Sequence, residues 1–348
     1  MPLRQRIDWP AVAAALAARI SHTSLHPAAM LRARAEHLRA SRQGGRPSRW
    51  ALAFSGGADS LALLLVLWAE GPGRWGRDFV VLHFNHRLRG RAADADEKFC
   101  RDVCSALGVS YVAGRWDKAR KGASEAEARE ARFGFFRREM GRRKLRLLWL
   151  AHQQDDIAES LLMRLARGSG TGGLAAPRPV QAMDGGRLHL RPLLTLKKAE
   201  LVAALEKAGA VWCEDASNAG DGHFRNRIRA RVLPAWVKAA GRDALAGAAL
   251  SRELLDEDDA ALEAWLDELK PLDRRGGLDL ARLAGKPRGL VRRALHRWFL
   301  AVRPETDLSR QGFNQLLAAV QRGQDTRFSL GAKGFAVIRR GRLGLQPG

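Results

Sequence analysis

The sequence predicts an α/β fold with a parallel sheet in its N-terminal part and a mainly helical C-terminal region that ends in short strands. Between residues 50 and 167, short apolar runs alternate with longer helical segments, which is typical of a parallel sheet with helices on both faces. From about residue 241 the pattern becomes helical and more acidic, and residues 325–348 show strand signals between glycines. A chain of 348 residues with 46% apolar content is long enough for two or three domains.

The elements are expected in the following order. The expected strands are 50–54, 79–84, 111–113 and 145–151, and the expected helices are 61–69, 94–107, 124–140, 155–167, 197–208 and 224–238. Ser124 and Thr195 are candidate N-caps, because a hydroxyl can accept a hydrogen bond from a free N–H of the first turn. Asp155 is a candidate cap of its own helix. The glycine-rich stretch 168–173 ends the alternation of strands and helices.

Breaks in the chain divide it into three expected segments. A run from Gly44 to Ser48 interrupts a basic helical stretch, so residues 1–47 are expected to form a basic helical N-terminal extension. Residues 48–240 contain the predicted sheet and a basic linker helix. Residues 241–348 are expected to form a C-terminal domain.

The charge of the chain is strongly positive, with 60 Lys+Arg, 37 Asp+Glu and a formal net charge of +23. A surface this basic repels itself unless it meets a polyanion. Nucleic acid is the leading candidate, because phosphate contacts supply most non-specific affinity. A compositional preference for arginine without a functional meaning is the alternative.

The cysteines and the hydropathy indicate where the protein works. Cys100, Cys104 and Cys213 form no disulfide framework and no C-x-x-C pair, which favours a reducing compartment such as the cytoplasm and argues against a structural zinc or iron–sulfur site. Cys100 and Cys104 are spaced to lie on one helix face as buried thiols. No apolar run approaches the roughly 20 residues of a membrane span, so no membrane partner is expected.

A short glycine-containing loop joins the first expected strand to the first helix. Its residues are Ser55, Gly56, Gly57, Ala58, Asp59 and Ser60. Glycines let the backbone approach an anion closely, the helix N-terminus adds free N–H groups and a positive dipole end, and the serines add hydroxyl donors. This pattern suits a pyrophosphate group. The loop is not a Walker loop, because the G-x-x-x-x-G-K-S/T spacing and its lysine are missing; an ordinary strand-to-helix turn is the alternative.

The hexapeptide resembles the Ser-Gly-Gly-x-Asp-Ser signature of the PP-loop ATP pyrophosphatases, which have an adenine nucleotide alpha hydrolase-like fold. These enzymes split ATP between the α- and β-phosphates and activate a carbonyl oxygen as an adenylate. Further segments resemble, in the same order, those of the tRNA(Ile)-lysidine synthetases. They are His83–Gly90, Glu125 with Ala128–Phe133, Ala151–Ser160, Arg167–Gly170, Arg191–Leu194, Asp215–Asn218 and Arg225–Arg229. The chain departs from the family at Gln153, Ile157 and Ser160, which weakens any role for position 153.

The resemblance implies a two-step reaction that uses ATP, Mg²⁺, free lysine and a tRNA(Ile) with a CAU anticodon. The ring carbonyl oxygen of the wobble cytidine attacks the α-phosphate and releases pyrophosphate, and the lysine amine then displaces AMP. Residues 48–240 are then the catalytic PP-loop domain, and residues 241–348 bind tRNA. A homodimer is left open.

Three carboxylates are candidates for chemistry. Asp59 in the loop could hold Mg²⁺ or orient the phosphates, and a helix-start carboxylate that complements the dipole is the alternative. Asp156 and Glu159 are i,i+3 on one helix face and follow the fourth strand, where open sheets bind ligands. They suit the ammonium of lysine, and one of them could accept its proton; a solvated acidic first turn is the alternative.

Phe84 and Asn85, after the second strand, could read adenine.

Histidines and arginines supply the other candidates. Arg129 and Arg132 are i,i+3 and could grip the α-phosphate or the nucleotide, Arg129 as part of the ATP site and Arg132 as a catalytic residue. His152 is expected to be a catalytic residue that contacts phosphate or substrate, and His83 is expected to contact ATP. The residues expected to meet the tRNA backbone are Arg225, Arg227 and Arg229. A satisfied core histidine and plain basic helix faces are the alternatives.

Three other functions remain open at this point. A tRNA thiolase of the same superfamily would need cysteines poised for sulfur transfer or cluster binding, and Cys100 and Cys104, on a helix after the second strand, are wrongly placed for that role. A small-molecule synthetase, such as an NAD or GMP synthetase, fits the charge of +23 poorly. A non-catalytic RNA-binding protein does not explain the intact loop.

Overall fold

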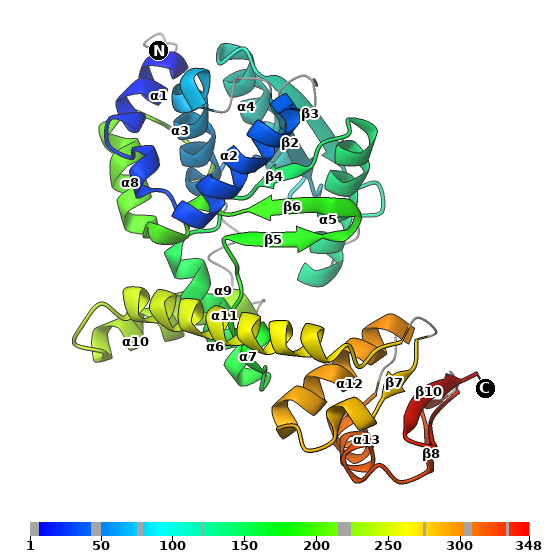
Figure 1. Cartoon of the computed structure of the whole chain (residues 1–348). Helices are drawn as coiled ribbons and strands as arrows, with labels where there is room; N and C mark the ends of the chain where they lie inside the picture. Colours follow the sequence, from blue (N-terminus) through cyan, green and yellow to red (C-terminus); the bar gives the residue numbers. More distant parts are fainter. Residues whose placement is uncertain are drawn as a thin grey trace. The chain divides into compact units, whose positions relative to one another are not determined.

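The computed structural model describes residues 7–42, 50–74, 79–119, 122–214, 224–273, 276–302, 308–331 and 334–347. The chain forms two compact units, Met1–Asp256 and Glu257–Gly348 (Figure 1). The motif segment Asp215–Asn218 lies outside the described residues.

The first unit is built on a six-stranded sheet with the order β3-β2-β1-β4-β6-β5. Its strands are β1 Trp50–Ala53, β2 Phe79–Asn85, β3 Ser110–Arg115, β4 Leu147–Trp149, β5 Val180–Met183 and β6 Arg187–Leu190. β1 pairs in parallel with β2 and β4, whereas the edge strand β5 is antiparallel to β6. The continuous apolar runs suit strands that are buried on both faces. The predicted parallel sheet is therefore confirmed.

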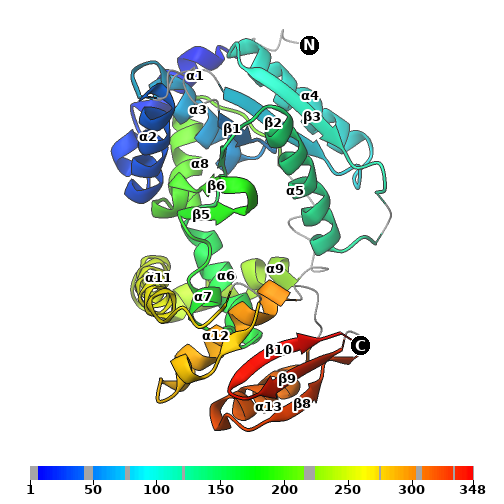
Figure 2. The same ribbon diagram turned by 45° about the vertical axis from the view of Figure 1, so that its right-hand side comes forward.

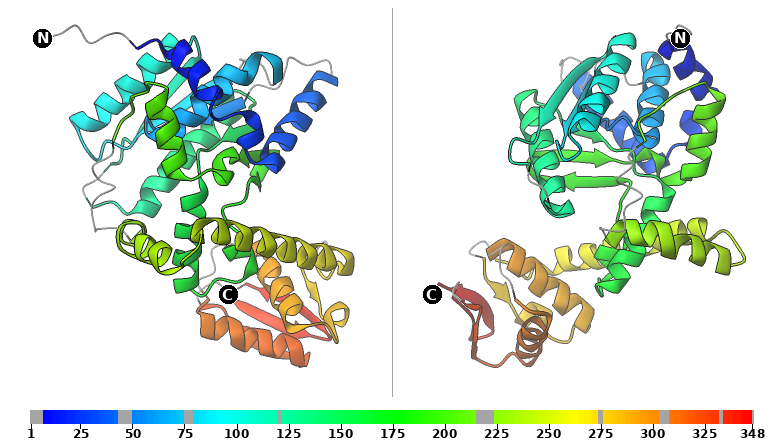
Figure 3. Two further views of the ribbon diagram at one scale, coloured as in Figure 1. Left: turned by 90° about the vertical axis from the view of Figure 1, so that its left-hand side faces the viewer. Right: turned by 180° about the vertical axis from the view of Figure 1, so that it is seen from behind.

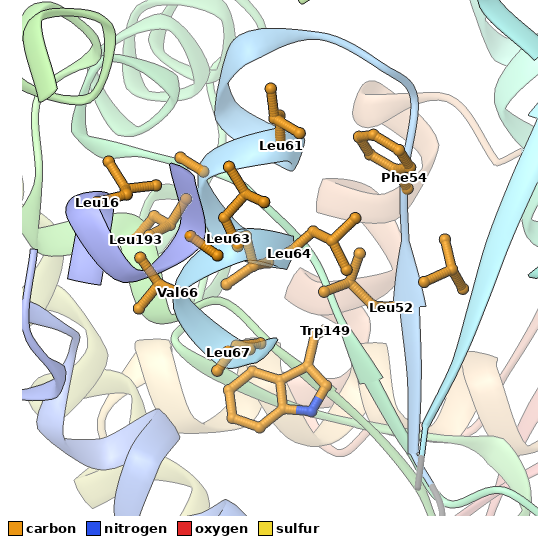
Figure 4. Packing of buried hydrophobic residues seen from close by; sticks show 14 of the residues in the cluster. Leu16, Leu52, Phe54, Leu61, Leu63, Leu64, Val66, Leu67, Trp149 and Leu193 are labelled. Carbon is orange, nitrogen blue, oxygen red and sulfur yellow. The ribbon is translucent and has the colours of Figure 1, made fainter. Parts of the chain in front are cut away.

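Helices cover both faces of this sheet (Figures 2 and 3). The helices α1 (Trp9–Ala17), α3 (Ala58–Arg74) and α4 (Arg91–Ala106) share a core with one face, and α5 (Glu125–Arg142) packs on the other. Side chains alternate along a strand, so Leu52 of β1 packs with α3 while its neighbour Ala51 packs with α5. Figure 4 shows Leu52 and Trp149 against the leucines of α3.

The N-terminal helices belong to this same core. Apolar residues of α1 recur at i, i+3, i+4 and i+7, which places them on one helix face; they are Trp9, Val12, Ala13 and Leu16, all buried. The Asp8 side chain caps α1 by accepting a hydrogen bond from the Ala11 N–H at 3.2 Å. From α2 (Pro27–Arg42), Ala29 and Ala33 are also buried in this core.

Two predicted helix caps have different outcomes. Ser124 caps α5 in a capping box with Glu127, as predicted. Thr195 does not cap α8 (Lys198–Lys207), whose N-cap position is Lys197. The Thr195 hydroxyl instead donates to the Ser24 carbonyl at 2.6 Å, which connects the segment before α8 to the N-terminal helices.

The remaining helices of the first unit lie beyond the sheet. They are α6 Gln154–Ala166, α7 Thr171–Leu174, α9 Phe224–Arg227, a π-helical turn Ile228–Val232, α10 Leu233–Ala239 and the first part of α11 Ala244–Leu269. The first unit also contains three short 3-10 turns, His22–Ser24, Asp184–Gly186 and Pro192–Thr195. A small core of Ala158, Leu233 and Ala248 joins α6, α10 and α11. The basic helix predicted over 224–238 is present with the π-helical turn inside it.

The second unit has its own core and sheet. Its elements are a 3-10 turn Ala281–Leu283, α12 Arg288–Val302, α13 Arg310–Arg322, β7 Leu278–Asp279, β8 Thr326–Ser329, β9 Phe335–Arg339 and β10 Arg342–Gln346. The strand order is β7-β10-β9-β8, and Trp298, Leu316 and Ile338 are fully buried. The predicted helical region that ends in short strands is confirmed. Across the described ranges, no helix combines the length and the apolar character needed to cross a membrane.

Candidate active site

The candidate site lies at the carboxyl edge of the sheet, between β1 and β4. These strands are neighbours, and the strand order reverses there, with β2 and β3 on one side and β6 and β5 on the other. Ligands of open α/β sheets bind in the crevice at such a switch point. The loop Ser55–Ser60 follows β1, and His152 to Asp156 follow β4, so the fold brings the predicted phosphate loop and the predicted carboxylates to the same edge.

The loop is organised by its own hydroxyl groups. Ser60 Oγ lies 3.1 Å from Ser55 Oγ and donates to the Gly57 carbonyl at 3.0 Å. It also accepts from the Ser55 N–H at 3.2 Å. The helix α3 begins within the loop, at Ala58, so its first N–H groups lack partners in the helix and can meet an anion.

Gly56 is the most constrained residue of the loop. Its φ is +92°, and a Cβ there would lie 3.1 Å from the Sγ atoms of both Cys100 and Cys213. The Cys213 N–H donates to the Gly56 carbonyl at 2.9 Å. Cys100, on the helix after the second strand, therefore lies close to Gly56. Both thiols fill the space beside the loop, and burial raises the pKa of Cys213 to about 12, so neither is an activated nucleophile.

Asp59, in the first turn of α3, has a carboxyl group with a raised pKa. Burial raises its pKa from 3.8 to about 6, with Lys198 opposing the rise and Asp156 adding to it. Its Oδ1 is buried and has no hydrogen-bond partner among the described residues. The Lys198 ammonium lies 3.9 Å from Oδ2. A strongly shifted carboxyl in a sheet-edge crevice is typical of a functional site.

The start of α6 is fixed by Gln153, a position for which the sequence predicted no role. Gln153 is the N-cap: its Oε1 accepts from the Asp155 N–H at 2.6 Å, and its N–H donates to Asp156 Oδ2 at 3.0 Å. The prediction that Asp155 caps this helix is wrong, because its Oδ2 accepts from the Lys198 N–H at 3.0 Å. Position 153 therefore has a structural role that orients Asp156.

The two residues expected to bind lysine are paired with two residues expected to bind tRNA. Arg225 contacts Asp156 Oδ1 at 2.5 Å and Glu159 Oε2 at 2.8 Å. Arg229 donates to both oxygens of Glu159, at 2.5 and 2.9 Å. Glu159 is only 1% exposed. Arg227 points elsewhere, with its guanidinium 5.8 Å from the centroid of the Phe224 ring. The structure thus joins two predicted sets into one buried charge network and leaves Arg227 outside it.

His152 lies among arginines from three different elements. Burial lowers its pKa well below the usual 6.5, and the neighbouring positive charges lower it further; these are Arg191, Arg225, Arg129 and Arg132. His152 Nδ1 and Arg132 Nε are buried without a partner. Burial also lowers the pKa of Arg132 to about 10. An uncharged imidazole beside an excess of guanidinium groups forms a site for an anion.

Arg191 also belongs to this cluster. It lies in the motif Arg191–Leu194, but the sequence predicted no role for its side chain. It is 3% exposed and donates to the Arg178 carbonyl and to Gln181 Oε1, both at 2.8 Å. Its Nε is buried without a partner, and burial lowers its pKa to about 10. Arg191 directly follows β6, which pairs with the strand β4 that leads to His152, and this position could have indicated that it belongs to the site. The sequence gives no comparable indication for Lys198 or Cys213.

The second-strand motif is mainly structural in this arrangement. His83 Nδ1 hydrogen-bonds the Phe54 carbonyl at 2.9 Å, and the ring is buried, so His83 supports the strand that carries the loop. Asn85 donates to Asp94 and to Glu97, both at 3.0 Å, and accepts from the Arg87 N–H at 2.9 Å. These contacts use the Asn85 amide to hold the following turn.

The sequence comparisons agree with this geometry. A family model described as a PP-loop domain matches residues 29–236. The tRNA(Ile)-lysidine synthase of Geobacter sulfurreducens is 36% identical over 282 residues, which cover 77% of this chain and 58% of that protein. The enzyme of the same name from Novosphingobium aromaticivorans is 40% identical over 241 residues, 67% of this chain and 71% of that protein. Among solved structures, the U34-tRNA thiolase NcsA from Methanococcus maripaludis has a TM-score of 0.49 and 16% identity, covering 66% of this chain and 78% of that chain.

The chain spans 58% of the Geobacter relative's length. The phosphate loop, the carboxylates after β4 and the arginines of α5 all lie within residues 29–236. The chain belongs to the PP-loop family and, within it, to the tRNA(Ile)-lysidine synthases.

Proposed function

We propose that the protein ligates lysine onto the wobble cytidine of a tRNA(Ile) with a CAU anticodon, with conversion of ATP to AMP and pyrophosphate. The observation that carries this proposal is the meeting of three features at one sheet edge: the phosphate loop with Asp59, the arginine cluster around His152, and the network of Asp156 and Glu159. A nucleotide, a second phosphate-bearing substrate and a charged amino acid each have a matching group there.

ATP would bind on the loop Ser55–Ser60, and Asp59 is the residue that would hold Mg²⁺. The fit is supported by the buried, unpartnered Oδ1 of Asp59 and by its raised pKa, because a cation supplies the missing partner. The described residues contain no group of three or more His, Cys, Asp or Glu placed to hold a metal, which suits an ion held by one or two carboxylates and by substrate phosphates. Bound Mg²⁺ neutralises charge on the phosphates during the transfer.

The arginine cluster would stabilise the α-phosphate while the cytidine oxygen attacks it. Arg129 and Arg132 supply guanidinium groups from α5, and such preorganised donors are most effective where water is excluded. His152 remains uncharged beside them, so it can donate or accept one hydrogen bond without adding charge. We place Arg132 and His152 among the catalytic residues and Arg129 and His83 in the ATP site, His83 through its support of the loop.

The lysine substrate carries both an ammonium and a carboxylate, and the network after β4 offers both complementary charges. Asp156 and Glu159 attract the ammonium, and Asp156 also raises the pKa of Asp59. Arg225 attracts the carboxylate of the amino acid. Asp156 and Glu159 are buried and are held by hydrogen bonds from Arg225 and Arg229, and preorganisation of this kind lowers the cost of binding.

The tRNA would be bound by basic surfaces outside this network. Arg227 remains a candidate for the phosphate backbone, whereas Arg225 and Arg229 act mainly through Asp156 and Glu159. We assign tRNA binding also to the C-terminal domain, residues 241–348, and the chain's charge of +23 supports a polyanionic partner. The three cysteines are free, which fits work in the cytoplasm.

The experiment is an incubation of the protein with ATP, labelled lysine and total tRNA. Lysine incorporation into tRNA with matching AMP release supports the proposal. ATP cleavage that does not depend on tRNA, but is stimulated by a small carboxylic acid or base, contradicts it.

A further inference from the structure

The phosphate loop has a lysine beside it that comes from a distant part of the sequence. Lys198, the first residue of α8, places its Nζ 3.9 Å from Asp59 Oδ2. Among the described residues, Asp59 is the one carboxylate within 4.0 Å of this ammonium. Asp59 belongs to the loop and to the first turn of α3, so the Lys198 ammonium lies beside the segment whose N–H groups can meet an anion.

The backbone of Lys198 is fixed to the sheet edge. Its N–H donates to Asp155 Oδ2 at 3.0 Å, and the Gln154 N–H donates to the Leu196 carbonyl at 2.8 Å. These two bonds join the start of α8 to the start of α6. The backbone position of Lys198 is therefore set by the same segment that carries Asp156.

The loop itself supplies no positive charge. Its six residues are Ser, Gly, Gly, Ala, Asp and Ser, whereas a Walker loop carries a lysine that reaches the terminal phosphates. Arg229 also acts on Asp59 electrostatically, but its guanidinium donates two hydrogen bonds to Glu159. A side chain in a loose 3.9 Å ion pair, 45% exposed, is in contrast available to a stronger anion.

We propose that Lys198 binds the β- and γ-phosphates of ATP and the pyrophosphate that leaves, and so supplies the cation that the loop lacks. The proposal deepens the proposed function and rests on it. The ammonium is a compact charge on a flexible stem, so it can turn from Asp59 to the phosphates without movement of α8. Negative charge increases on pyrophosphate as it departs, and a cation placed there stabilises it.

The test compares Lys198 with its neighbour Lys197. Lys197 has the same chemistry, but its Nζ is paired with Asp243 at 2.5 Å. The variants are Lys198→Met, Lys198→Arg and Lys197→Met in the full chain, and calorimetry measures binding of pyrophosphate and, separately, of AMP. We expect Lys198→Met to weaken pyrophosphate binding by about 10-fold or more, since a hydrogen bond to a charged group is lost. AMP binding should not change, because AMP carries only the α-phosphate.

Lys198→Arg should keep most of the pyrophosphate affinity, and Lys197→Met should bind both ligands like the wild type. Thermal unfolding of each variant shows whether the fold is intact. Wild-type pyrophosphate affinity in Lys198→Met overturns the proposal, as does an equal loss of AMP affinity or an equal effect of Lys197→Met. Failure of the wild-type protein to bind ATP at all would instead remove the proposed function.

Discussion

Arg225 Nε lies 2.8 Å from Glu159 Oε2, across 66 residues of sequence. Glu159 is almost completely buried and also receives two hydrogen bonds from Arg229. This pairing means that the acidic helix α6 and the basic helical segment after residue 224 form one structural unit beside the sheet edge.

Replacement of Arg225 by Met should affect both stability and lysine use. The change leaves Asp156 without its 2.5 Å partner, while Arg229 still pairs with Glu159. We expect a loss on the order of 1–3 kcal/mol in the free energy of unfolding and a rise in KM for lysine that exceeds the rise in KM for ATP. Denaturant unfolding and steady-state kinetics measure the two effects. Arg227→Met is the matched control, and an equal KM effect in both variants would contradict the assignment.

Gly56→Ala should impair ATP binding. The new methyl group meets Cys100 Sγ and Cys213 Sγ at 3.1 Å, and a φ of +92° is unfavourable for alanine. The loop must shift, so KM for ATP should rise at least about 10-fold, which corresponds to about 1.4 kcal/mol. Gly141→Ala, on the exposed end of α5 where a Cβ meets nothing within 4 Å, is the control. An unchanged ATP KM in Gly56→Ala would show that the loop tolerates displacement.

Asp59→Asn should abolish AMP formation and stabilise the fold above pH 6. The folded-state pKa is raised from 3.8 to about 6, so the folded protein binds this proton more tightly than the unfolded chain does. Stability therefore falls as pH rises through this window, and above it the ionised carboxylate costs up to about 3 kcal/mol. The variant's advantage over wild type should grow between pH 4 and 6 and then stay constant. Binding of tRNA should persist. Normal turnover would remove Asp59 from the mechanism.

Arg191→Met should change the pH dependence of activity. The variant removes the largest charge effect on His152, while Arg129, Arg132 and Arg225 remain. The pKa of His152 should then rise toward its usual value, and the acid limb of the kcat/KM profile should move to higher pH. Arg191→Lys keeps the charge and should keep the wild-type profile.

Arg191 also holds β5 through the Gln181 side chain, so Gln181→Ala serves as a control for stability alone. A wild-type pH profile in Arg191→Met, with the fold intact, would show that His152 does not titrate with activity.

Replacement of all three cysteines by alanine should leave AMP formation and lysine transfer in place. Cys100 and Cys104 are fully buried, so the change removes packing and lowers the melting temperature, but no chemical step of ligation uses a thiol. The measurement is AMP release together with labelled lysine in tRNA. Full loss of tRNA modification in a folded variant would favour sulfur transfer instead.

The sheet and the phosphate loop were predictable because their signals are local. Strand β1, the Gly-Gly turn and the start of α3 are contiguous in sequence, and the apolar run of a buried strand is readable without knowledge of its neighbours. The i,i+3 spacing of Asp156 and Glu159 likewise follows from helix geometry alone.

The remaining site residues depend on contacts between distant segments. The pairing of Arg225 with Glu159 and the approach of Lys198 to Asp59 arise only when α6, α8 and α9 meet at the sheet edge. The packing of α1 was obscured for another reason: its apolar face includes alanines, which lie on every side of this helix and blur the pattern. Gln153 caps α6 although glutamine is not among the preferred cap residues.

Lysine transfer to the wobble cytidine can be measured with two tRNA(Ile) transcripts that differ only at the wobble base, one with a CAU anticodon and one with UAU. Each is incubated with the protein, ATP and labelled lysine, and label in the tRNA is measured together with AMP. We expect lysine-dependent labelling of the CAU transcript, with AMP released in step, and no labelling of the UAU transcript. Equal labelling of both transcripts, or AMP release without label in the CAU transcript, would contradict it.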